Sequence, residues 1–155
     1  RNITVSTCGI IPAINRFAEE FSQVNLAISL HASNDEVRRK LMPIASLYKY
    51  DDLIDASKAY TKKTGRRITF EYSLIKDVND SVEDAERLAK HLKGWLAHVN
   101  LIPLNRVKER KYKATGNNAI TKFKEILEIR GIPVTIRRTL GNDIDAACGQ
   151  LRRTR

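Results

Sequence analysis

The stretch Val24-Asn25-Leu26-Ala27-Ile28-Ser29-Leu30 decides the fold, because it is a nearly continuous apolar run. Such a run is typical of a strand buried on both faces, as in a parallel sheet covered by helices. Other runs rich in β-branched and aromatic residues predict further strands. The predicted strands cover residues 3–6, 24–30, 67–75, 98–102 and 134–138.

Apolar residues at helical spacing separate these strands. The predicted helices cover residues 10–21, 34–41, 51–63, 82–92 and 120–130. Ser33, with Glu36 three residues later, predicts a capping box at the start of the second helix. Gly65 and Gly131 are expected to end the third and last helices. Strands that alternate with helices, joined by connections long enough for parallel pairing, indicate an α/β sheet or a partial (β/α) barrel.

Length and composition narrow the class of protein. The 155 residues, 42% of them hydrophobic, are enough for one core, so we expect residues 1–155 to form a single domain. No apolar run is long enough to span a membrane. Cys8 and Cys148 are far apart and form no disulfide framework, which suggests the cytoplasm. The three histidines and two cysteines have no metal-ligand spacing, so no metal site is expected.

The formal net charge of +10 is concentrated toward the C-terminus. Residues 105–155 carry 13 Lys and Arg residues against 5 Asp and Glu residues, whereas residues 1–104 are nearly neutral. A basic region of this kind favours a phosphate-backbone partner such as RNA. Residues 106–113, Arg137 and Arg138 are candidate phosphate contacts. The alternative is a solvated basic surface without a partner.

Polar residues lie at the predicted strand ends, where ligands bind in parallel α/β folds. These are Ser6-Thr7, Ser29-Leu30-His31, Glu71-Tyr72, Asn100 and, just beyond a strand, Asn105. The serines could instead cap the following helices, and a structural role for His31 is more common than a catalytic one. Glu71 on a buried strand should either have a partner or face solvent, because burying a lone carboxylate is costly.

Cys148 is a lone thiol flanked by Ala146, Ala147 and Gly149. The small neighbours leave room for a reacting group to approach, which favours a reactive cysteine. The alternative is a small buried hydrophobic residue.

Seven runs in order along the chain resemble the radical S-adenosylmethionine (SAM) RNA methyltransferases, in particular the RlmN family. They are 3–9 (ITVSTCG), 26–32 (LAISLHA), 40–44 (KLMPI), 67–72 (RITFEY), 78–81 (VNDS), 99–105 (VNLIPLN) and 141–151 (GNDIDAACGQL). The resemblance implies a radical SAM barrel, and this chain would be a C-terminal part lacking the first strands.

The same resemblance implies roles for individual residues. Ser6, Ser29, Leu30, His31 and Asn105 would contact S-adenosylmethionine, and Cys148 would carry the methyl group to C2 of adenosine in large-subunit (23S-type) rRNA and some tRNAs. Adenine C2 has no lone pair with which to attack a sulfonium methyl group, whereas a cysteine thiolate does. In the family, a [4Fe-4S] cluster and an external reductant then generate the radical that completes the transfer.

The sequence departs from the family pattern in several places. The cluster-binding C-x-x-x-C-x-x-C loop is absent from these 155 residues, and Arg106 replaces the usual proline after Asn105. We therefore expect this chain alone to be inactive, and its first strand to expose an open edge that could self-associate. The alternatives are a Cfr-type methyltransferase acting at adenine C8 and a non-enzymatic RNA-binding α/β module.

Overall fold

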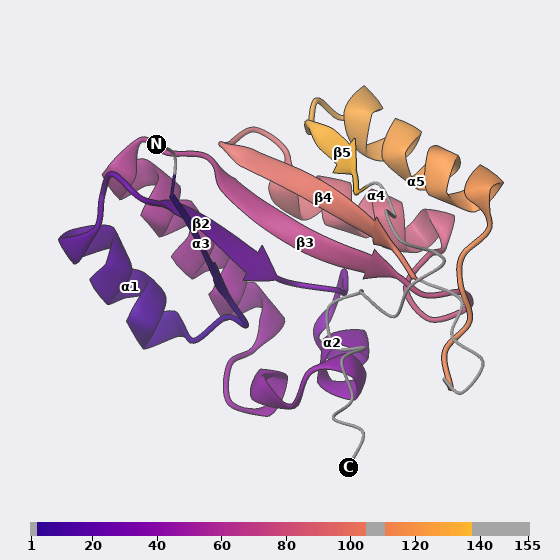
Figure 1. Ribbon diagram of the computed structural model, residues 1–155, viewed down its shortest axis with the longest axis horizontal. Coiled ribbons are helices and arrows are strands. Elements are labelled where there is room, and N and C mark those ends of the chain that lie inside the picture. Colours follow the sequence, from indigo (N-terminus) through magenta and orange to yellow (C-terminus); the bar gives the residue numbers. More distant parts are fainter. Residues whose placement is uncertain (1–2, 105–110, 138–155) are drawn as a thin grey trace, which may run out of the picture.

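The computed structural model describes residues 3–104 and 111–137. Five strands form one parallel sheet in the order β1-β2-β3-β4-β5 (Figure 1). They are β1 (Thr4–Thr7), β2 (Asn25–Ser29), β3 (Ile68–Leu74), β4 (Ala97–Pro103) and β5 (Val134–Ile136). Each strand pairs with the next in the sequence, and a helical crossover joins each pair. This arrangement confirms the α/β class and is that of a partial TIM-like barrel.

The crossovers contain five α-helices and one 3-10 helix. They are α1 (Ile11–Glu20), α2 (Asp35–Leu41), the 3-10 helix η1 (Pro43–Ser46), α3 (Tyr50–Thr64), α4 (Val82–Leu92) and α5 (Asn117–Ile129). The sequence pattern did not predict η1. Gly65 ends α3 in the left-handed conformation, with φ of 67°, which confirms the predicted stop signal.

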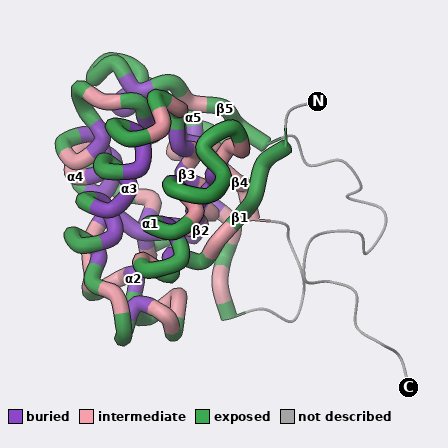
Figure 2. The backbone as a smooth tube through the Cα atoms, turned by 90° about the vertical axis from the view of Figure 1, so that its left-hand side faces the viewer, coloured by how far each residue is buried: buried purple, intermediate pink, exposed green. Residues whose placement is uncertain are grey.

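The helices gather on one side of the sheet, and the hydrophobic core lies between these two layers (Figure 2). Alternate residues of β3 enter this core, namely Ile68, Phe70, Tyr72 and Leu74, and all four are fully buried. Because side chains alternate along a strand, the residues between them face the opposite side. In β2, the three central residues Leu26, Ala27 and Ile28 are buried, as the apolar run predicted.

The predicted capping box at Ser33 is wrong. Asn34 is the N-cap of α2, and its side chain accepts a hydrogen bond from the Val37 N–H. Ser33 is instead fully buried and donates to Asp84 at 2.7 Å. Both residues favour an N-cap by the same chemistry, so the sequence alone could not separate them.

In the part of the chain that the structure describes, no helix has both the length and the apolar character needed to cross a bilayer.

Candidate functional site

The candidate site is the edge of the sheet where the parallel strands end. Ser6 lies in β1, Ser29 ends β2, and Leu30 and His31 follow it directly. Ser6 pairs with Ala27, so Ser6 and Ser29 are on the same face of the sheet, on adjacent strands. Neither serine caps a helix: Ile10 is the N-cap of α1 and Asn34 that of α2, so the capping alternative is wrong.

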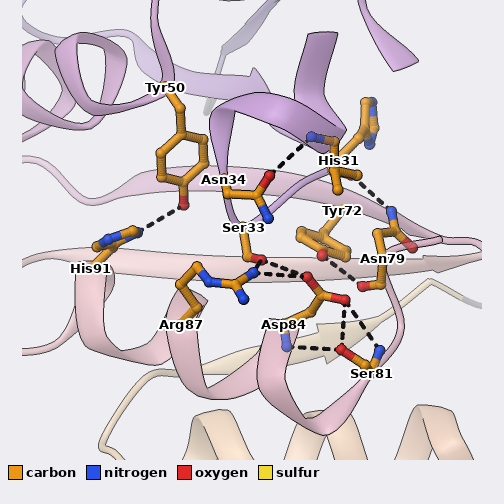
Figure 3. Close-up of polar contacts among 11 residues, drawn as sticks. His31, Ser33, Asn34, Tyr50, Tyr72, Asn79, Ser81, Asp84, Arg87 and His91 are labelled. Carbon is orange, nitrogen blue, oxygen red and sulfur yellow. Dashed lines mark hydrogen bonds and ion pairs between the residues drawn. The ribbon is translucent and has the colours of Figure 1, made fainter. Parts of the chain in front are cut away.

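His31 is fixed in an unusual backbone conformation at this edge (Figure 3). Its φ is 56°, in the left-handed region that non-glycine residues rarely adopt. The N–H groups of Leu30 and His31 both donate to the Glu71 carbonyl, at 3.0 and 3.3 Å. The Ser73 N–H donates to His31 Nδ1 at 3.0 Å, and Asn79 Nδ2 donates to the His31 carbonyl at 2.7 Å. Backbone and ring are therefore held by separate contacts.

These contacts set the protonation of the His31 ring. Burial, and to a smaller extent the nearby Arg38 charge, lower the pKa of His31 to about 4. Nδ1 accepts from the Ser73 N–H, so the proton of the neutral ring is on Nε2. At neutral pH His31 thus offers a hydrogen-bond donor at Nε2 and is a weak base. This geometry suits ligand binding better than general-base catalysis.

Leu30 can contribute to a ligand site only through its backbone. Its side chain is fully buried in the hydrophobic core, and its N–H is already bonded to Glu71. The carbonyl of Leu30 is the group left to contact a bound molecule.

Asn79 is a residue of this site that sequence reasoning did not single out. It is fully buried, and its Nδ2 donates to the carbonyls of His31 and Ser73, both at 2.7 Å. Its Oδ1 accepts from the Ile75 N–H at 2.7 Å, and its carbonyl accepts from the Tyr72 hydroxyl, also at 2.7 Å. Asn79 lies in the run Val78-Asn79-Asp80-Ser81, which predicted only a turn and no role for Asn79 in the site.

Arg38 is the second residue that the sequence did not reveal. Its guanidinium is fully buried and donates to the carbonyls of Cys8 at 2.7 Å and Ser29 at 3.3 Å. Burial lowers the pKa of Arg38. Gly9, with φ of 100°, lets the β1–α1 turn approach, since a Cβ there would lie 3.0 Å from Arg38 Nη2. Arg38 therefore ties the turn after β1 to the end of β2.

A buried polar cluster fastens the segment after His31 to helix α4 (Figure 3). Asp84 accepts from the Ser33 hydroxyl and pairs with Arg87 at 3.2 Å. Asp84 also forms a capping box with Ser81 at the start of α4. The cluster holds the β2–α2 connection beside the N-terminal turn of α4.

The structure describes some of the remaining predicted residues and not others. Glu71 is half-buried on the sheet face away from the core, which agrees with the expectation that it should not be buried alone. Asn105, Cys148, Arg138 and residues 106–110 lie outside the described residues. Arg137 is exposed just after β5.

The chain does not fit an iron–sulfur cluster by itself. It has two cysteines in all, at positions 8 and 148, and a cluster of this class needs more thiolates than two. Among the described residues, no group of three or more His, Cys, Asp or Glu side chains could hold a metal ion.

Two solved structures share the fold of this chain. A crystal structure of a radical SAM methyltransferase from Sphaerobacter thermophilus superposes with a TM-score of 0.90 and 51% identity, covering 96% of this chain and 43% of that one. A domain of a pyruvate-formate lyase-activating enzyme from Bacteroides vulgatus shares the fold, with a TM-score of 0.69 at 14% identity over 88% of this chain and 81% of that one. The fold is therefore shared with a segment of a radical SAM methyltransferase.

Curated proteins of similar sequence are named RNA methyltransferases. Proteins named probable dual-specificity RNA methyltransferase RlmN are 56% identical over 154 residues in Clostridium botulinum (strain Eklund 17B / Type B) and 58% identical over 153 residues in Thermoanaerobacter sp. (strain X514). The matches cover 99% of this chain but 44% and 45% of those proteins. Over the segment that it spans, the chain is similar to proteins named RlmN, and it spans less than half of their length. No family model matches it.

Proposed function

We propose that this chain is the segment of an RNA methyltransferase that binds S-adenosylmethionine at the C-terminal edge of the sheet. The observation that carries the proposal is the locked Ser29-Leu30-His31 turn, which presents a neutral N–H donor at His31 Nε2. The hydroxyls of Ser6 and Ser29 lie on the same face, and Asn105 would complete the contacts. S-adenosylmethionine would supply the methyl group.

We further propose that Cys148 carries this methyl group. Its thiolate attacks the sulfonium methyl carbon, a new sulfur–carbon bond forms, and the neutral thioether leaves. The product is S-methylcysteine, which would hold the carbon that the complete enzyme delivers to C2 of adenosine in rRNA and in some tRNAs. The names of the relatives support RNA as the substrate class, and the net charge of +10 suits a phosphate backbone.

The complete enzyme would act in the cytoplasm with a [4Fe-4S] cluster and an external reductant. The ligands of that cluster are not among the 155 residues, so no reaction step through it follows from this chain. We therefore expect the 155-residue chain alone not to turn over.

The test is methyl transfer in the complete protein with Cys148→Ala, using Cys8→Ala as the matched control. With methyl-labelled S-adenosylmethionine, mass spectrometry should find label on Cys148 of the wild type and of Cys8→Ala. Cys148→Ala should lose both the protein label and RNA methylation. Full RNA methylation by Cys148→Ala would refute the role of the thiol.

The same assay separates the alternatives. Digestion of the product RNA to nucleosides should yield 2-methyladenosine, whereas 8-methyladenosine would indicate the C8 reaction. A protein that binds RNA but transfers no methyl group would be the non-enzymatic module.

A further inference from the structure

Two exposed lysines face each other just beyond the carboxyl end of β3. Ile75, which follows this strand, forms an antiparallel bridge with Ala114, and the Lys76 N–H donates to the Lys113 carbonyl at 2.9 Å. Directly opposite residues of an antiparallel pair point to the same side, with Cβ atoms about 5 Å apart. Lys76 and Lys113 are both exposed, so the backbone pairing places two positive side chains next to each other in solvent.

Further hydrogen bonds fix this pairing to the loop that holds the His31 turn. The hydroxyl of Thr115, a buried residue, donates to Asp80 Oδ2 at 2.8 Å, and Asp80 Oδ1 accepts from the Asp77 N–H at 3.0 Å. Asp77 has a φ of 59°, in the left-handed region, so the chain turns sharply at this point. In the same loop, Asn79 donates to the His31 carbonyl. The two lysines therefore have a defined position beside the candidate site.

The charge of this lysine pair is not compensated by the residues that the structure describes. Among these residues, neither Lys76 nor Lys113 forms an ion pair. Lys111, also exposed, adds a third positive charge two residues from Lys113. Like charges directly opposite each other destabilise a strand pair, and a bound anion would relieve the repulsion. Because lysine binds phosphate as a point charge, a phosphate group suits this position.

We propose that Lys76 and Lys113 together bind one backbone phosphate of the substrate RNA, close to the nucleotide that is methylated. The inference rests on the proposed function, since it takes RNA as the substrate. The pair lies on the loop between Ser73 and Asn79, both of which hold His31, so a nucleotide next to the bound phosphate would lie at the edge of the site. Phosphate contacts set the register of a nucleic acid without reading its bases. The pair would thus position the RNA so that an adenine taken out of the stack reaches the sheet edge.

The test removes the charge from either partner of this contact in the complete protein. The probes are synthetic RNA hairpins that contain the target adenosine, each with one uncharged methylphosphonate linkage at a different position. Fluorescence anisotropy would compare the wild type with the double variant Lys76→Gln/Lys113→Gln. The double variant should bind the unmodified hairpin about 3- to 20-fold more weakly, since each exposed ion pair contributes up to about fivefold. Its slope of log affinity against log salt should fall by about 1.

The methylphosphonate series identifies the phosphate. One linkage near the target adenosine should weaken binding to the wild type by the same factor, and that linkage should have no further effect on the double variant. Lys76→Arg/Lys113→Arg keeps both charges and should bind as the wild type. Lys62→Gln/Lys93→Gln is the matched control, because these exposed lysines lie at the C-terminal ends of α3 and α4, at the opposite end of the sheet. The control should also bind as the wild type.

Three outcomes would overturn the inference. Additive losses from the double variant and the methylphosphonate at every linkage would show that the lysines contact no single phosphate. An equal loss in the control would indicate attraction by the net charge alone. A lower melting temperature of the double variant without RNA would indicate a structural role, whereas relief of the repulsion should leave it unchanged or slightly raised. These outcomes leave the proposed function intact, but a wild-type protein that binds no hairpin and methylates no RNA would contradict both.

Discussion

At the scale of single residues, the site depends on buried polar side chains that make several backbone contacts each. Asn79 and Arg38 together bond to the backbone of five residues in three segments, namely Cys8, then Ser29 and His31, and then Ser73 and Ile75. Such residues shape a ligand site without contacting the ligand. Their effect on binding would come through the position of the Ser29–His31 turn.

Asn79→Ala should destabilise the protein by about 2–4 kcal/mol, since it leaves a buried N–H and two part-buried carbonyls without their partner. Urea denaturation would measure the change in the free energy of unfolding. Asn118→Ala, at an exposed position of α5, should have little effect or stabilise slightly. A similar small effect of Asn79→Ala would contradict the role given to Asn79.

The lowered pKa of His31, about 4 against an ordinary 6.5, predicts a pH dependence of stability. Above pH 6.5 the ring is neutral in the folded and unfolded chains, and its full contribution to stability is present. As the pH falls from 6.5 to 4, the unfolded chain takes up a proton that the folded chain resists, so stability is lost. The loss should reach up to about 3 kcal/mol.

His31→Asn is the variant for this test, because asparagine tolerates the left-handed conformation. Unfolding free energies at pH 7 and pH 4.5 should differ less in the variant than in the wild type. His91 and His98 are present in both proteins, so their contributions cancel. An equal pH dependence in the two proteins would show that His31 titrates normally.

At the scale of the elements, Asp84 links the β2–α2 connection to α4. Asp84→Ala removes the capping box with Ser81 and the bond to Ser33, and should cost about 2–4 kcal/mol. Glu83→Ala, at the exposed neighbouring position, is the control and should cost less than about 1 kcal/mol. Thermal unfolding would rank the two variants, and equal melting temperatures would refute the link.

The sequence correctly predicted the strands and the α-helices. All five strands and all five α-helices follow from apolar spacing and stop signals, because these depend on neighbours within a few residues. The sequence pattern did not predict the 3-10 helix η1 or the true N-cap of α2. Ser33 and Asn34 are equally suitable as the N-cap, and Asp84, 51 positions after Ser33, decides between them by binding the Ser33 hydroxyl. Arg38 escaped notice because a charged helix residue is ordinarily exposed.

At the scale of the whole molecule, the outer edge of β1 has no partner strand among the described residues. Val5 on this strand is 40% exposed, and all but the last residue of β1 are exposed. An unpaired edge of this kind can join another chain. We expect the 155-residue chain to self-associate as its concentration rises.

Analytical ultracentrifugation over a concentration series would test this expectation. Val5→Lys should weaken the association, because a charge on an edge strand opposes pairing. Val82→Lys adds the same charge at a position 48% exposed on α4 and should leave it unchanged. A monomer at every concentration would contradict the expectation.

We propose above that the strand ends around His31 bind S-adenosylmethionine. Hydrogen exchange of the complete protein, with and without S-adenosylmethionine, tests it most directly. Binding at this site should add protection at residues 27–33 and 71–79, where the turn, Ser73 and Asn79 hold His31. Binding accompanied by protection elsewhere, with these two segments unchanged, would contradict it.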